Sequence, residues 1–419
     1  MTKHFKPRPH DEALLVISLS VSATRRGNLL YLDEKAVSGL ELYSRFWRGR
    51  VRAIFREGEP ASLLFGSWRD PASLPFEVMI VPEGKPVPDA LLRDASVVLA
   101  SGDYYGDLPL AERCRTLHVP VVFAIEYILE TRLQIVALWD VPLINKLWSM
   151  AVAIKTELAR RRAFARAAAL QANGTPAARS FAKAGRNVLT YFDSRISKSM
   201  IASQAEVAAK ARRRASGAPL RLAFSGRFER MKGADHLVPL AQRLVARGVA
   251  FQFDMFGKGS LAASMRDAVQ HNGLADRMTV HEPLPFATGL VPWMREHADL
   301  FICCHPQSDP SCTYLETLSC GVPIVGYRNR AFDGIMGIAD VGWSVPIGDL
   351  DAMADAIAML ANRPDEIADK ARAALSFAAK HSFEATFFSR TAHLRAVAFP
   401  NRRSHRPARA GRVAVPETV

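Results

Sequence analysis

The stretch that decides the fold is His305–Gly326, which reads HPQSDPSCTYLETLSCGVPIVG. An apolar run from Ala298 to Cys304 precedes it, and a second run, Val322 to Val325, lies near its end. Between the two runs, the spacing of apolar residues predicts a short helix that begins near Thr313 and ends at Gly321. A strand, a helix and a second strand in this order predict a βαβ crossover in a parallel sheet.

The start of this helix has two interpretations. Ser311 suits the first cap position because Pro310 breaks the preceding loop. The free N–H groups of a helix N-terminus at a strand-end crevice suit a diphosphate, and a carboxylate one turn in, Glu316, suits ribose hydroxyls. Alternatively, Thr313 and Glu316 form a capping box that needs no ligand. These residues alone support both interpretations equally.

A second stretch favours the ligand. Leu220–Ser225 predicts a strand, and the sequence GRFERMKG at 226–233 follows it before a predicted helix, about Ala234 to Arg247. Arg227 and Lys232 lie between the glycines of this turn. Isolated surface cations are common, but the turns after two strands of one parallel sheet point to the same crevice. Together the two stretches predict a diphosphate site.

These motifs resemble the retaining glycosyltransferases of family 4, which have the GT-B fold, an α/β architecture of two Rossmann-like domains facing each other across a cleft. The resemblance covers 220 to about 361. It rests on Gly226-Arg227 with Lys232-Gly233, on Phe256-Gly257-Lys258-Gly259, and on Leu315-Glu316 through Gly321-Val322-Pro323. It implies that Arg227 and Lys232 hold the donor diphosphate and that Glu316 binds ribose.

The resemblance also extends the expected donor site. The residues expected to line the diphosphate at the helix start are Cys312, Thr313, Tyr314 and Leu315. Gly257 and Lys258 are expected at the ribose or base, because glycine permits close backbone approach. The family has a donor-sugar glutamate where this chain has Ser308, with Asp309 beside it. Either Asp309 or backbone amides after Pro310 would then contact the sugar.

The catalytic candidates are Asp309 and Glu126. The family carries a histidine facing the donor sugar after the strand that corresponds to Val119–Ile125, and here that place holds Glu126, followed by Tyr127. Glu126 is equally well interpreted as a strand-end charge in water, although strand C-termini are where α/β proteins bind ligands. Asp103, at the end of the preceding strand, is interpreted as the first residue of an Asx turn.

Composition bounds the function. The chain has 419 residues, 49% of them hydrophobic, and can bury more than one core. Its net charge of +14 favours an anionic partner, such as a nucleotide, a phospholipid surface or a nucleic acid. It has neither an aromatic stacking set nor a named nucleic-acid motif, so we expect no nucleic acid. Five cysteines without CxxC spacing fit reduced thiols in a cytosol, and no apolar run reaches the roughly 18 residues of a membrane span.

The linker Ala215–Pro219 marks the expected domain boundary. The expected parts are a flexible N-terminus (1–12), an N-terminal Rossmann-like acceptor-side domain (13–215), a C-terminal Rossmann-like nucleotide-sugar-binding domain (216–382), a helix that in GT-B proteins crosses back (383–399) and a basic flexible tail (400–419). At the start of the N-terminal domain, Ala13–Val21 is interpreted as a buried strand in preference to the apolar core of a signal peptide.

Two further segments have alternative interpretations. Trp139–Arg166 has an apolar helical face and a basic end, and its apolar positions are Leu143, Leu147, Met150, Ile154 and Leu158. We favour a helix facing the domain core over one lying on an anionic bilayer, the contact that a lipid-linked acceptor would need. Asp349-Leu350-Asp351 is similar to a metal-binding DxD motif, but Asp349 stands where a helix N-cap belongs, so capping is favoured over metal binding. No metal is predicted, because two cations and a helix N-terminus would already neutralise the diphosphate.

The resemblance implies a glycosyltransferase that moves a sugar from a nucleoside-diphosphate donor to a carbohydrate or glycolipid acceptor with retention. Neither a cofactor nor a metal is expected. The expected setting is cell-surface polysaccharide or glycolipid synthesis in the cytoplasm, with peripheral contact at the inner face of the membrane. Because Ser308 replaces a family glutamate, the alternative is a GT-B scaffold that binds nucleotide without turnover.

Overall fold

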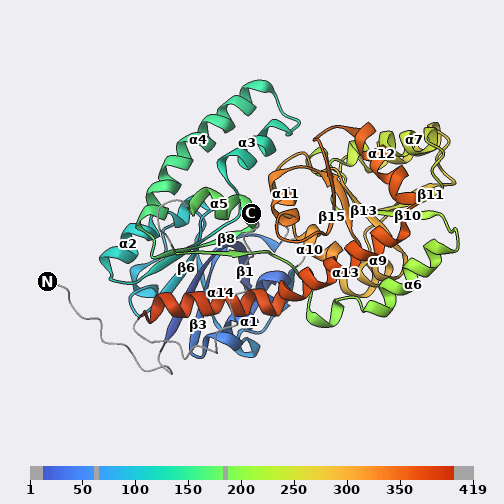
Figure 1. Ribbon diagram of the computed structural model, residues 1–419. Helices are drawn as coiled ribbons and strands as arrows, with labels where there is room; N and C mark the ends of the chain where they lie inside the picture. The colour runs from blue at the N-terminus through green and yellow to red at the C-terminus, as the bar shows by residue number, and fades with distance from the viewer. Residues whose placement is uncertain (1–12, 61–65, 183–186, 401–419) are drawn as a thin grey trace, which may run out of the picture.

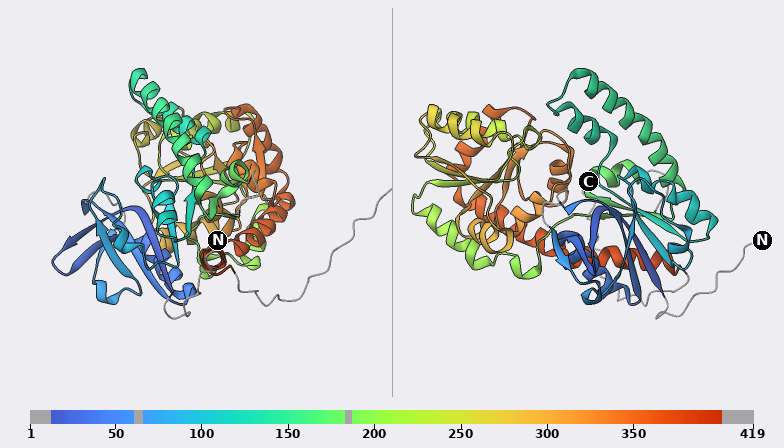
Figure 2. Two further views of the ribbon diagram at one scale, coloured as in Figure 1. Left: turned by 90° about the vertical axis from the view of Figure 1, so that its left-hand side faces the viewer. Right: turned by 180° about the vertical axis from the view of Figure 1, so that it is seen from behind.

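The computed structural model describes residues 13–60, 66–182 and 187–400, which form two α/β domains (Figure 1). The expected N-terminal segment 1–12 and the expected basic tail 400–419, apart from Pro400, lie outside the described residues. Figure 2 shows the two domains from two further directions, with a sheet and covering helices in each.

The first domain is built on a nine-stranded sheet. Its parallel part has the order β5-β3-β1-β6-β7-β8-β9, and β2 and β4 extend β1 as antiparallel strands. The strands are β1 (Leu14–Arg26), β2 (Leu29–Asp33), β3 (Arg50–Glu57), β4 (Gly66–Arg69), β5 (Glu77–Val81), β6 (Val97–Ser101), β7 (Val121–Ile125), β8 (Ala169–Asn173) and β9 (Val188–Tyr191).

Helices bury both faces of this sheet. Leu14 and Val16 of β1 belong to one apolar cluster, and Leu15 and Ile17 belong to another on the opposite face. Strands buried on both faces read as continuous apolar runs, which is why the runs that form β1 and β7 could be predicted. The helices are α1 (Glu34–Trp47), α2 (Leu110–Thr116), α3 (Leu129–Ala137), α4 (Leu143–Arg166) and α5 (Gly174–Phe181).

The second domain has a six-stranded parallel sheet in the order β12-β11-β10-β13-β14-β15. This is the doubly wound order in which ligands bind where the strand order reverses, here at the carboxyl ends of β10 and β13. The strands are β10 (Leu220–Ser225), β11 (Phe251–Phe256), β12 (Met278–His281), β13 (Leu300–Cys303), β14 (Ile324–Tyr327) and β15 (Gly342–Val345).

The last helix returns to the first domain. Helix α14 packs against α1, and Arg390 Nε donates to Gln171 Oε1 of β8 at 2.8 Å. Figure 1 shows α14 running beneath the first sheet. The remaining helices are α6 (Gln204–Ala215), α7 (Leu237–Ala246), α8 (Ala262–His271), α9 (Val291–His297), α10 (Cys312–Ser319), α11 (Arg330–Met336), α12 (Leu350–Ala361), α13 (Pro364–Lys380) and α14 (Phe383–Ala398).

Helix α6 belongs to the second domain, whereas the boundary predicted from the sequence places it in the first. It was assigned to the first domain, but Val207 packs against Ala371 and Leu375 of α13, and Lys210 Nζ donates to the carbonyls that end α10. The change of domain therefore falls between β9 and α6. The Asp349 interpretation is confirmed, because its side chain accepts a hydrogen bond from the Ala352 N–H at 2.9 Å.

Two expectations for the first domain were wrong. Strand β8 was missed, because Ala-Leu-Gln-Ala-Asn contains only one large apolar residue and the strand signal is correspondingly weak. Helix α4 was expected to turn its apolar face to the core, yet Leu143 is 70% exposed and Leu158 is 58% exposed. Its buried side chains include Glu157 and Arg160 instead.

The loop after β10 makes a backbone contact that only glycine permits. Gly233 has φ +66°, and a Cβ there would lie 2.0 Å from the Cys304 carbonyl oxygen. Gly248 has nearly the same φ, +69°, with nothing within 4 Å of the added Cβ. The two positions therefore separate backbone strain from steric overlap.

We expect Gly248→Ala to lower the free energy of unfolding by about 1 kcal/mol, from strain alone. Gly233→Ala should lower it by about 3 kcal/mol or more, because a clash adds to the strain. Urea denaturation of both variants measures the difference. Equal losses of unfolding free energy in the two variants would show that the loop after β10 is not in close steric contact with Cys304 at the end of β13.

Candidate functional site

Lys232 brings together the two stretches singled out in the sequence. Its Nζ donates to Asp309 Oδ2 at 2.7 Å and to Ser311 Oγ at 3.4 Å, and the residue is only 8% exposed. Ser311 is the N-cap of α10, where its hydroxyl accepts from the Thr313 N–H. A cation from the loop after β10 therefore lies at a helix N-terminus after β13, where the strand order reverses.

The capping-box interpretation of Thr313 and Glu316 is wrong. The N-cap is Ser311, and the Glu316 carboxylate accepts from Arg195 Nε at 2.9 Å. The Arg195 guanidinium also lies 4.0 Å from the centre of the Phe286 ring. The Glu316 side chain on α10 is thus held by Arg195, which lies outside the motifs singled out in the sequence.

The Arg227 side chain is exposed in the loop after β10. Its Nη2 donates to Met231 Sδ at 3.3 Å, and its positive charge favours a lower pKa of the Tyr127 phenol. Burial nevertheless raises the pKa of Tyr127, and the Glu126 carboxylate adds to that rise. Arg227 and Lys232 both follow β10. Lys232 bonds the N-cap residue of α10, whereas within the described part of the chain no hydrogen bond joins Arg227 to that helix.

Ser308 and Asp309 have different surroundings. The Ser308 hydroxyl accepts from the Arg330 N–H, its own N–H donates to Gln134, and its carbonyl accepts from Thr131. Ser308 is buried and already bonded on every polar group. Of the two residues expected at a donor sugar, only Asp309 reaches Lys232.

Tyr314 and Leu315, also expected at the diphosphate, have side chains that point into the core, so only their backbone groups lie at the start of α10. The Tyr314 and Leu315 side chains belong to the core of the second domain, and the Tyr314 hydroxyl is bonded to Asn329. The Tyr314 N–H donates to the Ser311 carbonyl at 3.3 Å. Among the described residues, the Cys312 N–H has no hydrogen-bond acceptor, which leaves it free for an anion.

Gly257 and Lys258 contact the backbone of the loop after β10. A Cβ at Gly257 would lie 2.0 Å from the Gly226 carbonyl oxygen, and the Lys258 carbonyl accepts from the Phe228 N–H at 2.9 Å. The close approach that glycine permits here is to protein backbone. Among the described residues, neither Gly257 nor Lys258 is hydrogen-bonded to Lys232 or Glu316.

Glu126 is the main ionisable group on the first-domain side. Its backbone N–H donates to Asp103 Oδ2 at 2.6 Å, and its Oε1 accepts from Asn173 Nδ2 at 3.3 Å. Burial, followed by the negative charges of Asp193 and Asp103, raises the pKa of Glu126 to about 7, while Lys35 opposes the rise. Glu126 is partly buried and bonded to Asn173, so its carboxylate is not fully solvated.

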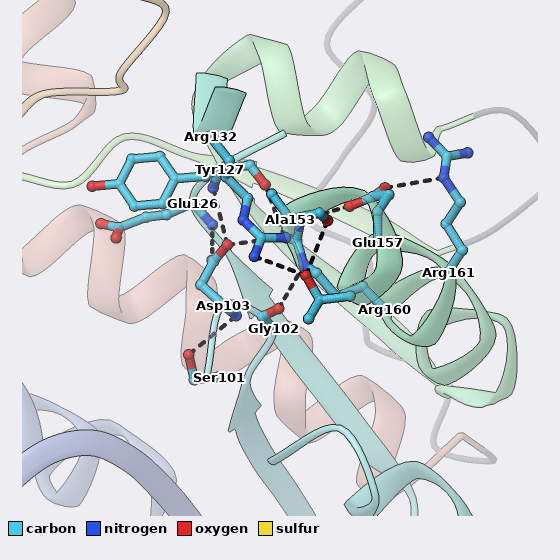
Figure 3. A network of polar contacts seen from close by, with 11 residues as sticks. Ser101, Gly102, Asp103, Glu126, Tyr127, Arg132, Ala153, Glu157, Arg160 and Arg161 are labelled. Atoms are coloured by element: carbon cyan, nitrogen blue, oxygen red, sulfur yellow. Dashed lines mark hydrogen bonds and ion pairs between the residues drawn. The ribbon is translucent and has the colours of Figure 1, made fainter. Parts of the chain in front are cut away.

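Asp103 fixes the backbone that carries Glu126, so its interpretation as an Asx turn is wrong. Its carboxylate accepts from the Glu126 and Tyr127 N–H groups and from Arg160 Nη2 at 2.9 Å. Arg160, on α4, also donates to the Gly102 and Tyr127 carbonyls and to Glu157. Figure 3 shows the Glu126 carboxylate and the Tyr127 phenol both directed away from Arg160.

A second group joins the domains directly. Lys35 Nζ pairs with Asp193 Oδ2 and lies 3.4 Å from Cys312 Sγ, and the Cys312 thiol donates to Asp193 at 3.3 Å. Burial, with the Asp193 charge, raises the pKa of the Cys312 thiol and keeps it protonated. Lys35 and Asp193 were missed, although Asp193 lies two residues after the end of β9.

The space enclosed at this junction is small. A cavity of about 10 Å³, the size of one water site, lies between Asn173 and Asp193 of the first domain and Pro310 and Ser311 of the second. Neither Arg195 nor Glu316 lines this cavity.

Part of the chain is similar in sequence to known proteins. Residues 219–363 match the family described as Glycosyl transferases group 1. The chain is 29% identical over 140 residues to 2-deoxystreptamine N-acetyl-D-glucosaminyltransferase of Streptomyces fradiae, covering 33% of this chain and 32% of that protein. It is 25% identical over 157 residues to the putative colanic acid biosynthesis glycosyltransferase WcaL of Salmonella typhimurium, covering 35% and 37%. The chain thus matches about one third of the length of these relatives.

Solved structures resemble nearly the whole chain. Anabaena HepE in complex with UDP aligns with a TM-score of 0.61 at 14% identity, covering 92% of this chain and 99% of HepE. Sucrose-phosphate synthase from Thermosynechococcus elongatus aligns with a TM-score of 0.59 at 13% identity, covering 92% and 99%. At these identities the likeness concerns the fold, and it confirms the predicted GT-B architecture.

The raised pKa of Glu126 predicts a pH-dependent stability. The folded protein binds this proton more tightly than the unfolded chain, so stability is lost as pH rises from about 4.5 to about 7. Glu126→Gln removes the charge but keeps the oxygen that accepts from Asn173. At about pH 8 we expect the free energy of unfolding of the variant to exceed that of the wild type by at most about 3 kcal/mol. At about pH 5 this difference should disappear.

Thermal denaturation at the two pH values measures this effect. Glu112→Gln is the control of opposite sign, because a hydrogen bond from Arg115 lowers the pKa of Glu112. A Glu126→Gln advantage that is the same at both pH values would show that Glu126 does not titrate near neutrality.

Proposed function

We propose that this protein is a glycosyltransferase that moves a sugar from a nucleoside-diphosphate donor to a hydroxyl of a carbohydrate or lipid-linked acceptor, with retention at the anomeric carbon. The observation that carries the proposal is Lys232 Nζ beside Ser311, the N-cap of α10. This contact lies at the strand-order reversal of the domain that matches the group 1 glycosyl transferases.

The chemistry requires positive charge at the leaving group. When the bond from the anomeric carbon to the diphosphate oxygen breaks, its electron pair stays on the diphosphate. Lys232, Arg227 and the Cys312 N–H are the groups that would stabilise the growing charge. Two cations and a helix N-terminus can balance a diphosphate, so we propose transfer without a metal.

The acceptor hydroxyl then attacks the electron-poor anomeric carbon on the face that the diphosphate leaves. Its proton passes to the departing phosphate oxygen, so the donor configuration is retained and no protein nucleophile is needed. The carboxylates of Glu126 and Asp309 would face the sugar and favour positive charge at its ring. Glu316 would accept from ribose hydroxyls once Arg195 has moved away.

A scaffold that binds nucleotide without turnover is the second candidate. It is favoured by Ser308, which has no carboxylate and is fully bonded within the protein. The two candidates differ in one result. The scaffold gains thermal stability from a nucleotide but releases no diphosphate from any nucleotide sugar.

We expect Lys232→Ala and Arg227→Ala each to lower kcat/KM by roughly 10- to 150-fold, the loss of one charge-assisted hydrogen bond. The donor is first chosen as the sugar conjugate of whichever of UDP, GDP and ADP raises the melting temperature most. Release of nucleoside diphosphate is then measured for each variant.

Lys380→Ala, an exposed cation at the end of α13, is the control and should retain wild-type activity. Activity within twofold of wild type in both site variants would remove Arg227 and Lys232 from the mechanism.

A further inference from the structure

Helices α3 and α4 form a hairpin that projects from the first domain (Figure 1). Large apolar side chains on α4 are exposed to solvent. Leu143, Ile144 and Trp148 are each 70% exposed, and Leu147, Ile154 and Leu158 are all more than half exposed. The apolar periodicity found in the sequence is therefore real, but it faces away from the core.

The orientation of α4 is fixed by its inner side. Glu157, Arg160 and Phe164 are buried on that side, and Arg160 donates to Gly102, Asp103, Glu157 and the Tyr127 carbonyl. Turning the helix to bury its apolar side would break these bonds and expose Phe164. The outer apolar face is thus a stable feature of the folded domain.

The charge of the outer face has one sign. Lys155 and Arg162 are exposed on α4, and neither has a carboxylate partner within the described residues. Glu157 is the one carboxylate on the helix, and its side chain is only 5% exposed. An exposed face that combines isoleucine, leucine and tryptophan with unpaired cations matches the interface of an anionic bilayer.

We propose that the α3–α4 hairpin binds an anionic lipid bilayer through this outer face of α4. Ile144, Leu147 and Trp148 enter the boundary between headgroups and acyl chains, and Lys155 and Arg162 pair with lipid phosphates. The helix lies in the plane of the surface, because none of the described helices is long and apolar enough to cross a bilayer.

The same hairpin reaches the candidate site. On α3, Thr131 and Gln134 bond Ser308, and Glu130 pairs with Arg330 at 2.9 Å. A bilayer held at α4 therefore lies next to the gap between the domains. If the proposed function holds, this placement suits an acceptor that is carried on a membrane lipid.

Vesicle co-sedimentation of the full chain tests the proposal. Phosphatidylcholine vesicles with and without phosphatidylglycerol are the probes. We expect the wild type to sediment only with the anionic vesicles and less at high salt. Lys155→Gln with Arg162→Gln should weaken binding about 30-fold, since each cation near an anionic surface contributes about 1 kcal/mol. Ile144→Ser with Trp148→Ser should weaken it at least as much.

The control variant is Ile338→Ser with Ile347→Ser, which removes two similarly exposed isoleucines from the second domain and should bind as wild type. Unchanged melting temperatures establish that the variants are folded. Vesicle binding that survives both α4 variants, or no binding of the wild type, would overturn the proposal. So would a wild-type dimer in solution that Ile144→Ser with Trp148→Ser makes monomeric, since the face would then join two copies.

This experiment is independent of turnover. If diphosphate release in solution persists while vesicle binding fails, the docking proposal falls and the proposed function stands. If binding succeeds and no donor is cleaved, the proposed function falls alone.

Discussion

The structure depends on one buried cation placed beside the start of a short helix. Lys232 is removed from water, and its Nζ reaches both Asp309 and Ser311. A buried ammonium group is costly unless it is paired, so an anion must share this place in every state of the protein. Asp309 provides that anion here, and the Cys312 N–H at the start of α10, which has no acceptor among the described residues, adds a second attraction for a negatively charged ligand.

Both domains contribute charges of both signs at this junction. The second domain contributes Arg227, Lys232, Asp309 and Glu316, whereas the first contributes Lys35, Glu126 and Asp193. Lys232 and Lys35 are each paired with an aspartate near the start of α10. If the proposed function holds, a diphosphate would compete with Asp309 for Lys232.

The central strands β10, β13 and β14 of the second sheet were predictable because they are largely buried and read as apolar runs with turns between them. The Lys232 contact was also predictable, since turns after two strands of a parallel sheet meet at one edge. Arg195 and Lys35 escaped prediction because each reaches α10 from more than 100 residues away along the chain, and no local pattern marks them. Periodicity located the apolar face of α4, but periodicity carries no information on whether core or solvent faces it.

A structure of the protein with a bound nucleoside diphosphate tests the central claim most directly. We expect the β-phosphate within hydrogen-bonding distance of Lys232 Nζ and the Cys312 N–H, and the ribose hydroxyls at Glu316 with Arg195 displaced. A nucleotide bound elsewhere, with the Lys232–Asp309 and Arg195–Glu316 pairs intact, would contradict the account.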